Sequence, residues 1–241
     1  MKPAKPSISL HRGVLVFIAL ALASVIGVAL VVLRYLMVHQ FEYFNLIWNL
    51  FLAWLPLGFA FCADYFRASR WRFLLCALLW LLFIPNSPYL MTDLMHLRPR
   101  LPVPFWFDIV LVQSFVLTGL LLGFLSLYLM HRLVTHRYGW RYGWLFTFLV
   151  LGLTALGVYL GRFQRWNSWD LFINPIALLA DIWDVIIHPR ANKKAIVFST
   201  LWYGFLVSTY LAFYALAALH RTTASEATNP ERPTRILASG D

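Results

Sequence analysis

An acid and a base stand three residues apart just after the third strongly apolar segment of the chain. The run reads Thr-Asp-Leu-Met-His over residues 92–96, so a helix there places Asp93 and His96 on one face. A carboxylate beside an imidazole can ligate a metal ion or orient a general base. The same run is typical of a helix start with Thr92 as N-cap and ordinary hydrogen bonding. Asp93 and His96 are the candidate catalytic residues.

A second polar run, residues 161–170, reads Gly-Arg-Phe-Gln-Arg-Trp-Asn-Ser-Trp-Asp. Arginine forks bind carboxylates or phosphates with two parallel hydrogen bonds, and tryptophan favours the membrane interface. The run is compatible with a ligand site or with a clamp in which Arg162 or Arg165 pairs with an acid. The acids expected within reach are Asp93, Asp108 and Asp170. The candidate ligand-binding residues are Asn86, Asp108, Arg162, Arg165, Asn167, Trp169 and Asp170.

Asn86 lies between two prolines in the run Pro-Asn-Ser-Pro-Tyr, residues 85–89. Each proline removes a backbone donor, so we expect the helix to kink or unwind there. Freed carbonyls in a membrane must face protein or a water-filled cavity, although the helix can also simply end in a turn. Asp108 opens the next apolar segment, where its alternative role is to complement the positive helix N-terminus.

The segment 170–189 predicts an amphipathic helix with Pro175 at its first position and Pro189 after its end. Asn174, Asp181, Asp184 and His188 form one polar stripe on it. Asp181, Asp184 and His188 could bind a divalent metal ion, or they could be the hydrated face of a helix lying at the membrane surface.

The composition decides the class of protein. Apolar residues make up 61% of the 241 residues and charged residues only 12%, and the mean hydropathy is +0.70. Soluble domains carry about twice that charge, so a soluble globular protein is excluded. The aromatic content of 17% excludes a disordered chain. The net charge of +10 fits basic residues flanking membrane spans, and nucleic acid is not an expected partner.

The long apolar runs predict an all-α membrane bundle of about six transmembrane helices, plus one amphipathic interfacial or re-entrant helix. A spanning helix needs about 20 apolar residues. The predicted spans are 13–37, 45–66, 71–90, 107–130, 143–160 and 195–219. We therefore divide the chain into an N-terminal arm (1–12), an integral membrane domain (13–220) and a polar, disordered tail (221–241).

The basic residues predict the orientation. More than half of the 20 Lys and Arg fall on the side of the six-span topology that holds both termini. The positive-inside rule places that side in the cytoplasm. Asn86–His96, Asp108 and Arg162–His188 then share the outer face, as one common site would require.

These motifs resemble those of the bacterial membrane proteins of domain-of-unknown-function family 1361. The similarity covers roughly residues 45–215 and is carried by 85–89, 92–97, 106–108, 161–170 and 181–182. Relatives commonly have alanine where Ser87 stands here. The resemblance implies a bacterial inner-membrane protein and brings no activity, cofactor or mapped site.

Three functions remain open. The outward-facing pocket could bind or process an anionic or lipid-linked ligand, with Asp93 or His96 as base and the two arginines holding the anion. The chain could instead be a small transporter, for which Asn49 is the best mid-span polar residue, or a structural accessory protein with a charge-clamped bundle. The sequence carries no nucleophile elbow, P-loop, HExxH or dinucleotide fingerprint, so the cofactor is unknown. The oligomeric state is not predicted.

Overall fold

The computed structural model of the chain describes residues 10–99 and 102–227, and every regular element in these residues is helical. The elements are α1 (Leu10–Val38), α2 (Phe44–Tyr65), α3 (Arg70–Phe83), α4 (Asn86–Tyr89), η1 (Leu90–His96), α5 (Phe105–Tyr138), α6 (Trp140–Tyr159), η2 (Leu160–Gln164), α7 (Asp170–Ile173), α8 (Pro175–Ile187) and α9 (Lys193–Ala227).

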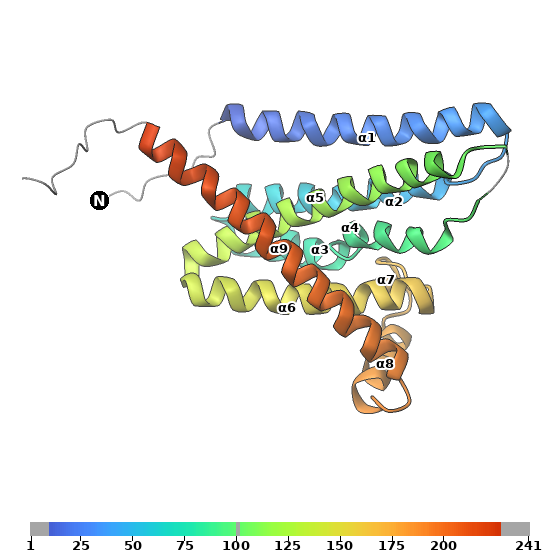
Figure 1. The fold of residues 1–241 in the computed structure, drawn as a ribbon. Helices are drawn as coiled ribbons and strands as arrows, with labels where there is room; N and C mark the ends of the chain where they lie inside the picture. Colours follow the sequence, from blue (N-terminus) through green and yellow to red (C-terminus); the bar gives the residue numbers. More distant parts are fainter. Residues whose placement is uncertain (1–9, 100–101, 228–241) are drawn as a thin grey trace, which may run out of the picture.

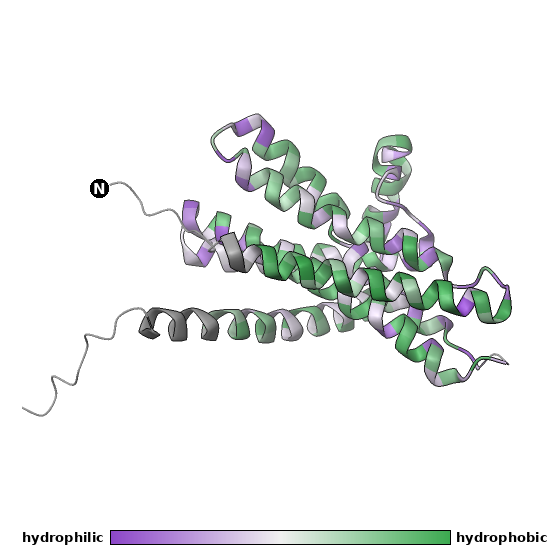
Figure 2. Cartoon of the chain, turned by 90° about the horizontal axis from the view of Figure 1, so that it is seen from above, coloured by the Kyte–Doolittle hydropathy of each residue, from purple (hydrophilic) through white to green (hydrophobic). Residues whose placement is uncertain are grey.

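Six helical segments of the described chain are long and apolar enough to cross a membrane, which confirms the predicted bundle. Consecutive spans run in opposite directions, so the start of α1 and the end of α9 lie at the same end of the molecule (Figure 1). We call the other end the loop end, because it holds the α1–α2, η1–α5 and α6–α9 connections. Hydrophilic residues gather near the ends of the helices (Figure 2).

The predicted span boundaries need small corrections. The fourth span is longer than expected because α5 continues to Tyr138, and η2 extends the fifth span to Gln164. Helix α9 continues through Ala227, into the segment predicted to be a polar tail. The first residues of the predicted N-terminal arm (1–9) and the rest of the tail (228–241) lie outside the described residues.

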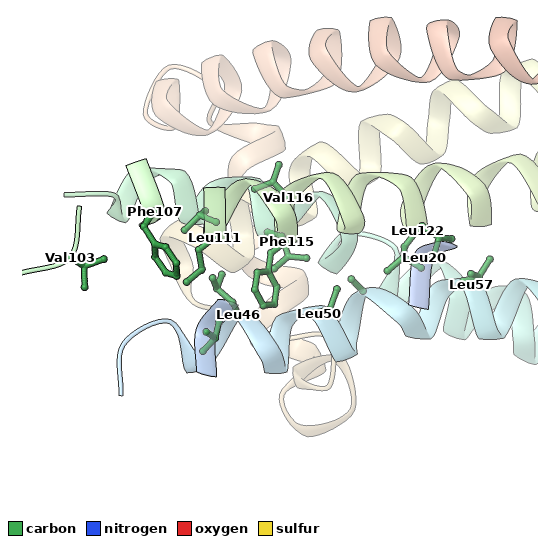
Figure 3. Packing of buried hydrophobic residues seen from close by; sticks show 14 residues of the cluster. Leu20, Leu46, Leu50, Leu57, Val103, Phe107, Leu111, Phe115, Val116 and Leu122 are labelled. Atoms are coloured by element: carbon green, nitrogen blue, oxygen red, sulfur yellow. The ribbon is translucent and has the colours of Figure 1, made fainter. Parts of the chain in front are cut away.

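Helix α5 lies at the centre of the bundle, where it packs against α1, α2 and α6. At the loop-end half, Phe107, Leu111 and Phe115 point toward Leu46 and Leu50 of α2 (Figure 3). This layer is almost fully buried. Burial of an aromatic or leucine side chain contributes about 1.5–3 kcal/mol in water, but in lipid the gain comes from close packing instead.

The third span is broken, as its two prolines predict. Helix α3 ends at Phe83, the single turn α4 follows, and η1 continues as a 3-10 helix to His96. Thr92 lies inside η1 and donates its hydroxyl back to the Tyr89 carbonyl at 2.7 Å, so the predicted N-cap role for Thr92 is wrong. The backbone turns before Thr92, at the prolines, and η1 already begins at Leu90.

Three glycines hold this broken segment. A Cβ on Gly119 would stand 2.7 Å from the Ser87 carbonyl oxygen, and one on Gly123 would stand 2.8 Å from Ser87 Cβ. From the other side, a Cβ on Gly157 would lie 2.8 Å from Pro85. Such small residues let helix backbones approach closely in lipid. The Gly-x-x-x-Gly motifs of α5 and α6 thus fix the position of α4 and of η1 beyond it.

Helix α8 carries the predicted polar stripe, and its apolar residues divide into a buried and an exposed face. Leu178 and Val185 are buried against the protein, the polar stripe lies beside them, and an apolar face of Ile176, Leu179 and Trp183 is exposed. The helix starts at Pro175 as expected, although Asn174 makes no side-chain capping bond.

Candidate functional site

Asp93, His96 and Arg162 converge at the loop end. Arg162 Nη1 lies 3.4 Å from Asp93 Oδ1, and Arg162 Nη2 lies 2.5 Å from Nδ1 and 2.8 Å from Nε2 of His96. His96 Nδ1 is 3.8 Å from Asp93 Oδ1. The expected pairing of one arginine of the 161–170 run with Asp93, Asp108 or Asp170 is therefore present, and Asp93 is that acid.

The side chains of Asp93, Arg162 and His96 differ in their exposure to solvent. The Asp93 side chain is 6% exposed and that of Arg162 12%, whereas the His96 side chain is 61% exposed. Asn49 of α2 adds a donor, because its Nδ2 lies 3.4 Å from Asp93 Oδ2. A buried, hydrogen-bonded carboxylate thus supports a guanidinium and an open imidazole. This arrangement can hold an anion at the surface or orient His96 for proton transfer.

The backbone is irregular at Asp93, His96 and Arg162. Asp93 and His96 lie on a 3-10 helix, in which residues three apart are eclipsed. Arg162 lies on η2, a π-helix, and such turns occur frequently at functional sites. Arg165 follows in the left-handed region with φ of 63°, a conformation that costs about 1–3 kcal/mol for a residue other than glycine.

Asn86 joins the broken third span to the 161–170 run. Its Nδ2 donates to Ser168 Oγ at 2.9 Å and to the Phe83 carbonyl at 3.0 Å, and Ser168 Oγ donates to the Leu82 carbonyl at 3.1 Å. The carbonyls freed near Pro85 are thus satisfied by protein. Asn86 positions the 161–170 run through Ser168, and both hydrogen bonds of its amide nitrogen are used for this contact and for the Phe83 carbonyl.

Asp108 does not join the Asp93 cluster. It forms a separate buried clamp, in which Arg34 Nε and Nη2 lie 2.7 and 3.2 Å from its two carboxylate oxygens. Glu42 is 2.7 Å from the same guanidinium, and the Tyr43 ring lies under it at 4.8 Å. The expectation that Asp108 shares one site with Arg162 is corrected by this pairing, since α1 brings its own arginine to α5.

The remaining polar and aromatic residues of the 161–170 run make contacts outside the Asp93 cluster. Asp170 Oδ2 accepts from the backbone and side chain of Asn167 in a local turn, and Trp169 packs edge-on against Trp48 at 6.5 Å. Arg165 is exposed. Of the predicted ligand-binding residues, Arg162 reaches the cluster and Arg165 lies at the surface three residues beyond it.

The polar side chains of the α8 stripe form two separate groups of hydrogen bonds. Asp181 accepts from Trp166 Nε1 at 2.8 Å, whereas Asp184 bonds Asn192 at 2.9 Å and His188 at 2.8 Å. Hydrogen bonds from Asn192 and then His188 hold the pKa of Asp184 below its ordinary value. Within the described chain, no three His, Cys, Asp or Glu side chains gather closely enough to hold a metal ion. The structure does not bring Asp181, Asp184 and His188 together.

Sequence reasoning missed the partners supplied by the first two spans. Arg34 is a lone charge near the end of the first apolar run, a signal that an intramembrane partner exists. Asn49 was visible as a mid-span polar residue, but its contact with Asp93 required the packing of α2 against η1.

The comparisons with known proteins identify the family. Neither the comparison with curated proteins nor that with solved structures gives a match. The family model described as "Protein of unknown function (DUF1361)" matches residues 48–224, which include Asn49, the Asp93 cluster and Asp108 but not Arg34. Since that match spans well over half of the chain, the protein belongs to the DUF1361 family.

Proposed function

We propose that this multi-pass membrane protein binds an anionic, phosphate-bearing ligand at its loop end, through Arg162 and the exposed His96. The observation that carries the proposal is the convergence of Asp93, His96 and Arg162 on irregular helical turns. Asp93 holds the Arg162 guanidinium in place from the buried side, while the exposed His96 side chain lies on the solvent side. A headgroup of a lipid or a lipid-linked envelope precursor has this chemistry.

The proposal includes the location of the chain. The family resemblance and the distribution of Lys and Arg support the bacterial inner membrane with both termini in the cytoplasm. The loop end then faces the extracytoplasmic side, where lipid-linked ligands of the envelope are accessible. The two alternatives have less support: Asn49, on which the transporter depended, is engaged by Asp93, and a structural clamp does not require a side chain as exposed as that of His96.

Thermal unfolding of the detergent-purified protein with glycerol phosphate tests this function. A ligand that binds only the folded state stabilises it, by about 2.7 kcal/mol at 100 times the Kd. We expect glycerol phosphate to raise the Tm of the wild type above that in sodium chloride of equal ionic strength. The rise should shrink in Arg162→Lys, which lacks the fork, and vanish in Arg162→Gln.

Arg137→Gln is the matched control, because Arg137 is an exposed arginine at the other end of the bundle. It should keep the full rise in Tm. The proposal is wrong if glycerol phosphate leaves the wild type unchanged, or raises the Tm of wild type and Arg162→Gln equally.

The Asp93–His96 contact favours a second candidate, in which the bound ligand is also processed. Asp93 would orient His96 as general base, with Arg162 on the anion. A structure with bound glycerol phosphate separates the two functions. Processing requires a ligand oxygen within about 2.6–3.2 Å of a His96 ring nitrogen; an anion held by arginine alone supports binding only.

A further inference from the structure

An apolar groove runs along the seam between α6 and α9. Its volume is about 360 Å³, and its walls are Phe148, Leu149, Gly152 and Leu153 of α6 and Tyr203 of α9. Leu149 is 60% exposed and Leu153 54%, because the other face of α6 packs into the bundle. The groove therefore opens toward the surrounding lipid, within two spanning helices.

Gly152 keeps the groove open. A Cβ at this position would lie 3.9 Å from the Tyr203 ring, in ordinary contact, so a larger side chain would occupy the groove without displacing the helices. This glycine differs from Gly157 on the same helix, whose missing side chain admits Pro85 of the third span. The space at Gly152 is filled by nothing in the described part of the chain.

An aromatic column lies between the level of the groove and the loop end. Trp202, next to Tyr203, stacks on Phe198 at 5.0 Å, and Phe198 meets Phe163 at 5.1 Å. At the top of the column, Lys194 Nζ lies 3.9 Å from the centre of the Phe163 ring. A lysine with an aromatic ring at this level is a typical interfacial anchor.

The distance from the groove to the top of the column is close to the hydrocarbon thickness of one membrane leaflet. Gly152 and Phe163 are eleven positions apart in the sequence, which corresponds to about 16 Å at 1.5 Å per residue. Half of a hydrocarbon core of about 30 Å is nearly the same depth. A lipid with its phosphate at Lys194 would therefore place its chain end in the groove.

We propose that the α6–α9 seam binds one anionic phospholipid, with the phosphate at Lys194 and an acyl chain in the groove at Gly152. The exposed basic residues Arg190 and Lys193 lie beside Lys194 in the sequence and favour a negative headgroup. Neither Lys194 nor Gly152 belongs to the Asp93 cluster, so this lipid site is independent of the function proposed above.

Native mass spectrometry tests the proposal, with protein taken from vesicles of equal phosphatidylglycerol and phosphatidylcholine. We expect the wild type to retain phosphatidylglycerol in preference. Lys194→Gln should lower that retention about fivefold, as expected for one lysine near an anionic phosphate. Gly152→Leu should lower the retention of both lipids, because leucine fills the groove.

Two control variants separate this effect from general damage. Gly204→Leu adds the same side chain on α9 where a Cβ meets nothing, and Arg67→Gln removes an exposed charge at the other end of the bundle. Both should retain phosphatidylglycerol as the wild type does. Equal retention in the wild type, Lys194→Gln and Gly152→Leu would overturn the proposal. A Gly152→Leu variant that changes from dimer to monomer would also overturn it, since a second copy would then fill the groove.

Discussion

Among the described residues of the loop end are two arginine–aspartate contacts, and their surroundings give them different roles. In the Arg34–Asp108 pair both side chains are almost fully buried and joined by two bonds. In the Arg162–Asp93 contact the distance is longer and an exposed imidazole completes the cluster. We assign the Arg34–Asp108 pair to holding α1 on α5 and the Arg162–Asp93 contact to function, because the second contact lies beside the exposed His96 side chain.

At the residue scale, Arg34→Met should strongly destabilise the protein. It leaves the Asp108 carboxylate buried without its main partner, and breaking a buried pair costs about 3–5 kcal/mol. Arg67→Met is the control, since the Arg67–Asp64 pair is 3.7 Å apart with side chains 49% and 55% exposed. An exposed pair contributes about 0–1 kcal/mol. Thermal unfolding in detergent measures both, and equal losses in the two variants would contradict the assignment of Arg34–Asp108 as the clamp.

At the element scale, the broken third span depends on the glycines that face it. Helices α5 and α6 approach α4 from two sides, and each contributes a residue without a side chain at the contact. The single turn α4 is too short to be stable alone. Its shape, and with it the position of Asp93 and His96, is therefore imposed by α5 and α6.

Gly119→Ala tests this dependence. The added Cβ would stand 2.7 Å from the Ser87 carbonyl oxygen, so backbone must shift, and overpacking of this kind costs about 1–3 kcal/mol. Gly58→Ala is the control, because a Cβ there meets nothing within 4 Å and alanine favours the helix by about 1 kcal/mol. We expect a lower Tm for Gly119→Ala and an unchanged or higher Tm for Gly58→Ala. A Tm that rises in both variants would show that α4 is not held by this contact.

At the scale of the whole molecule, the alternating spans place the candidate site and the polar stripe of α8 at one end (Figure 1). Reporter fusions after residues 101 and 174 should therefore report the extracytoplasmic side, and fusions after His136 and Thr222 the cytoplasm. Alkaline phosphatase, which is active only outside the cytoplasm, is a suitable reporter. Phosphatase activity after His136 together with none after residue 174 would invert the molecule and place the Arg162 site in the cytoplasm.

The sequence by itself determined the class of fold and the segments that cross the membrane. A segment that crosses the lipid bilayer must be long, apolar and internally hydrogen-bonded. Six long apolar runs in the sequence therefore predict a bundle of six transmembrane helices. The break at Pro85 and Pro88 was also predictable, because proline acts on its own local backbone. The proximity of Arg162 to an acid at the loop end followed from topology, since both lie at span ends at the same end of the bundle.

Only the tertiary structure decided which acid meets which arginine. Asp93, Asp108 and Asp170 were equivalent in sequence, yet Arg162 meets Asp93, Arg34 takes Asp108, and Asp170 turns back to Asn167. These choices depend on how far α5 and α6 approach the broken span and on the rotation of α1 against α5. Helix rotation and separation arise from side chains packing across the whole interface, so no local pattern encodes them.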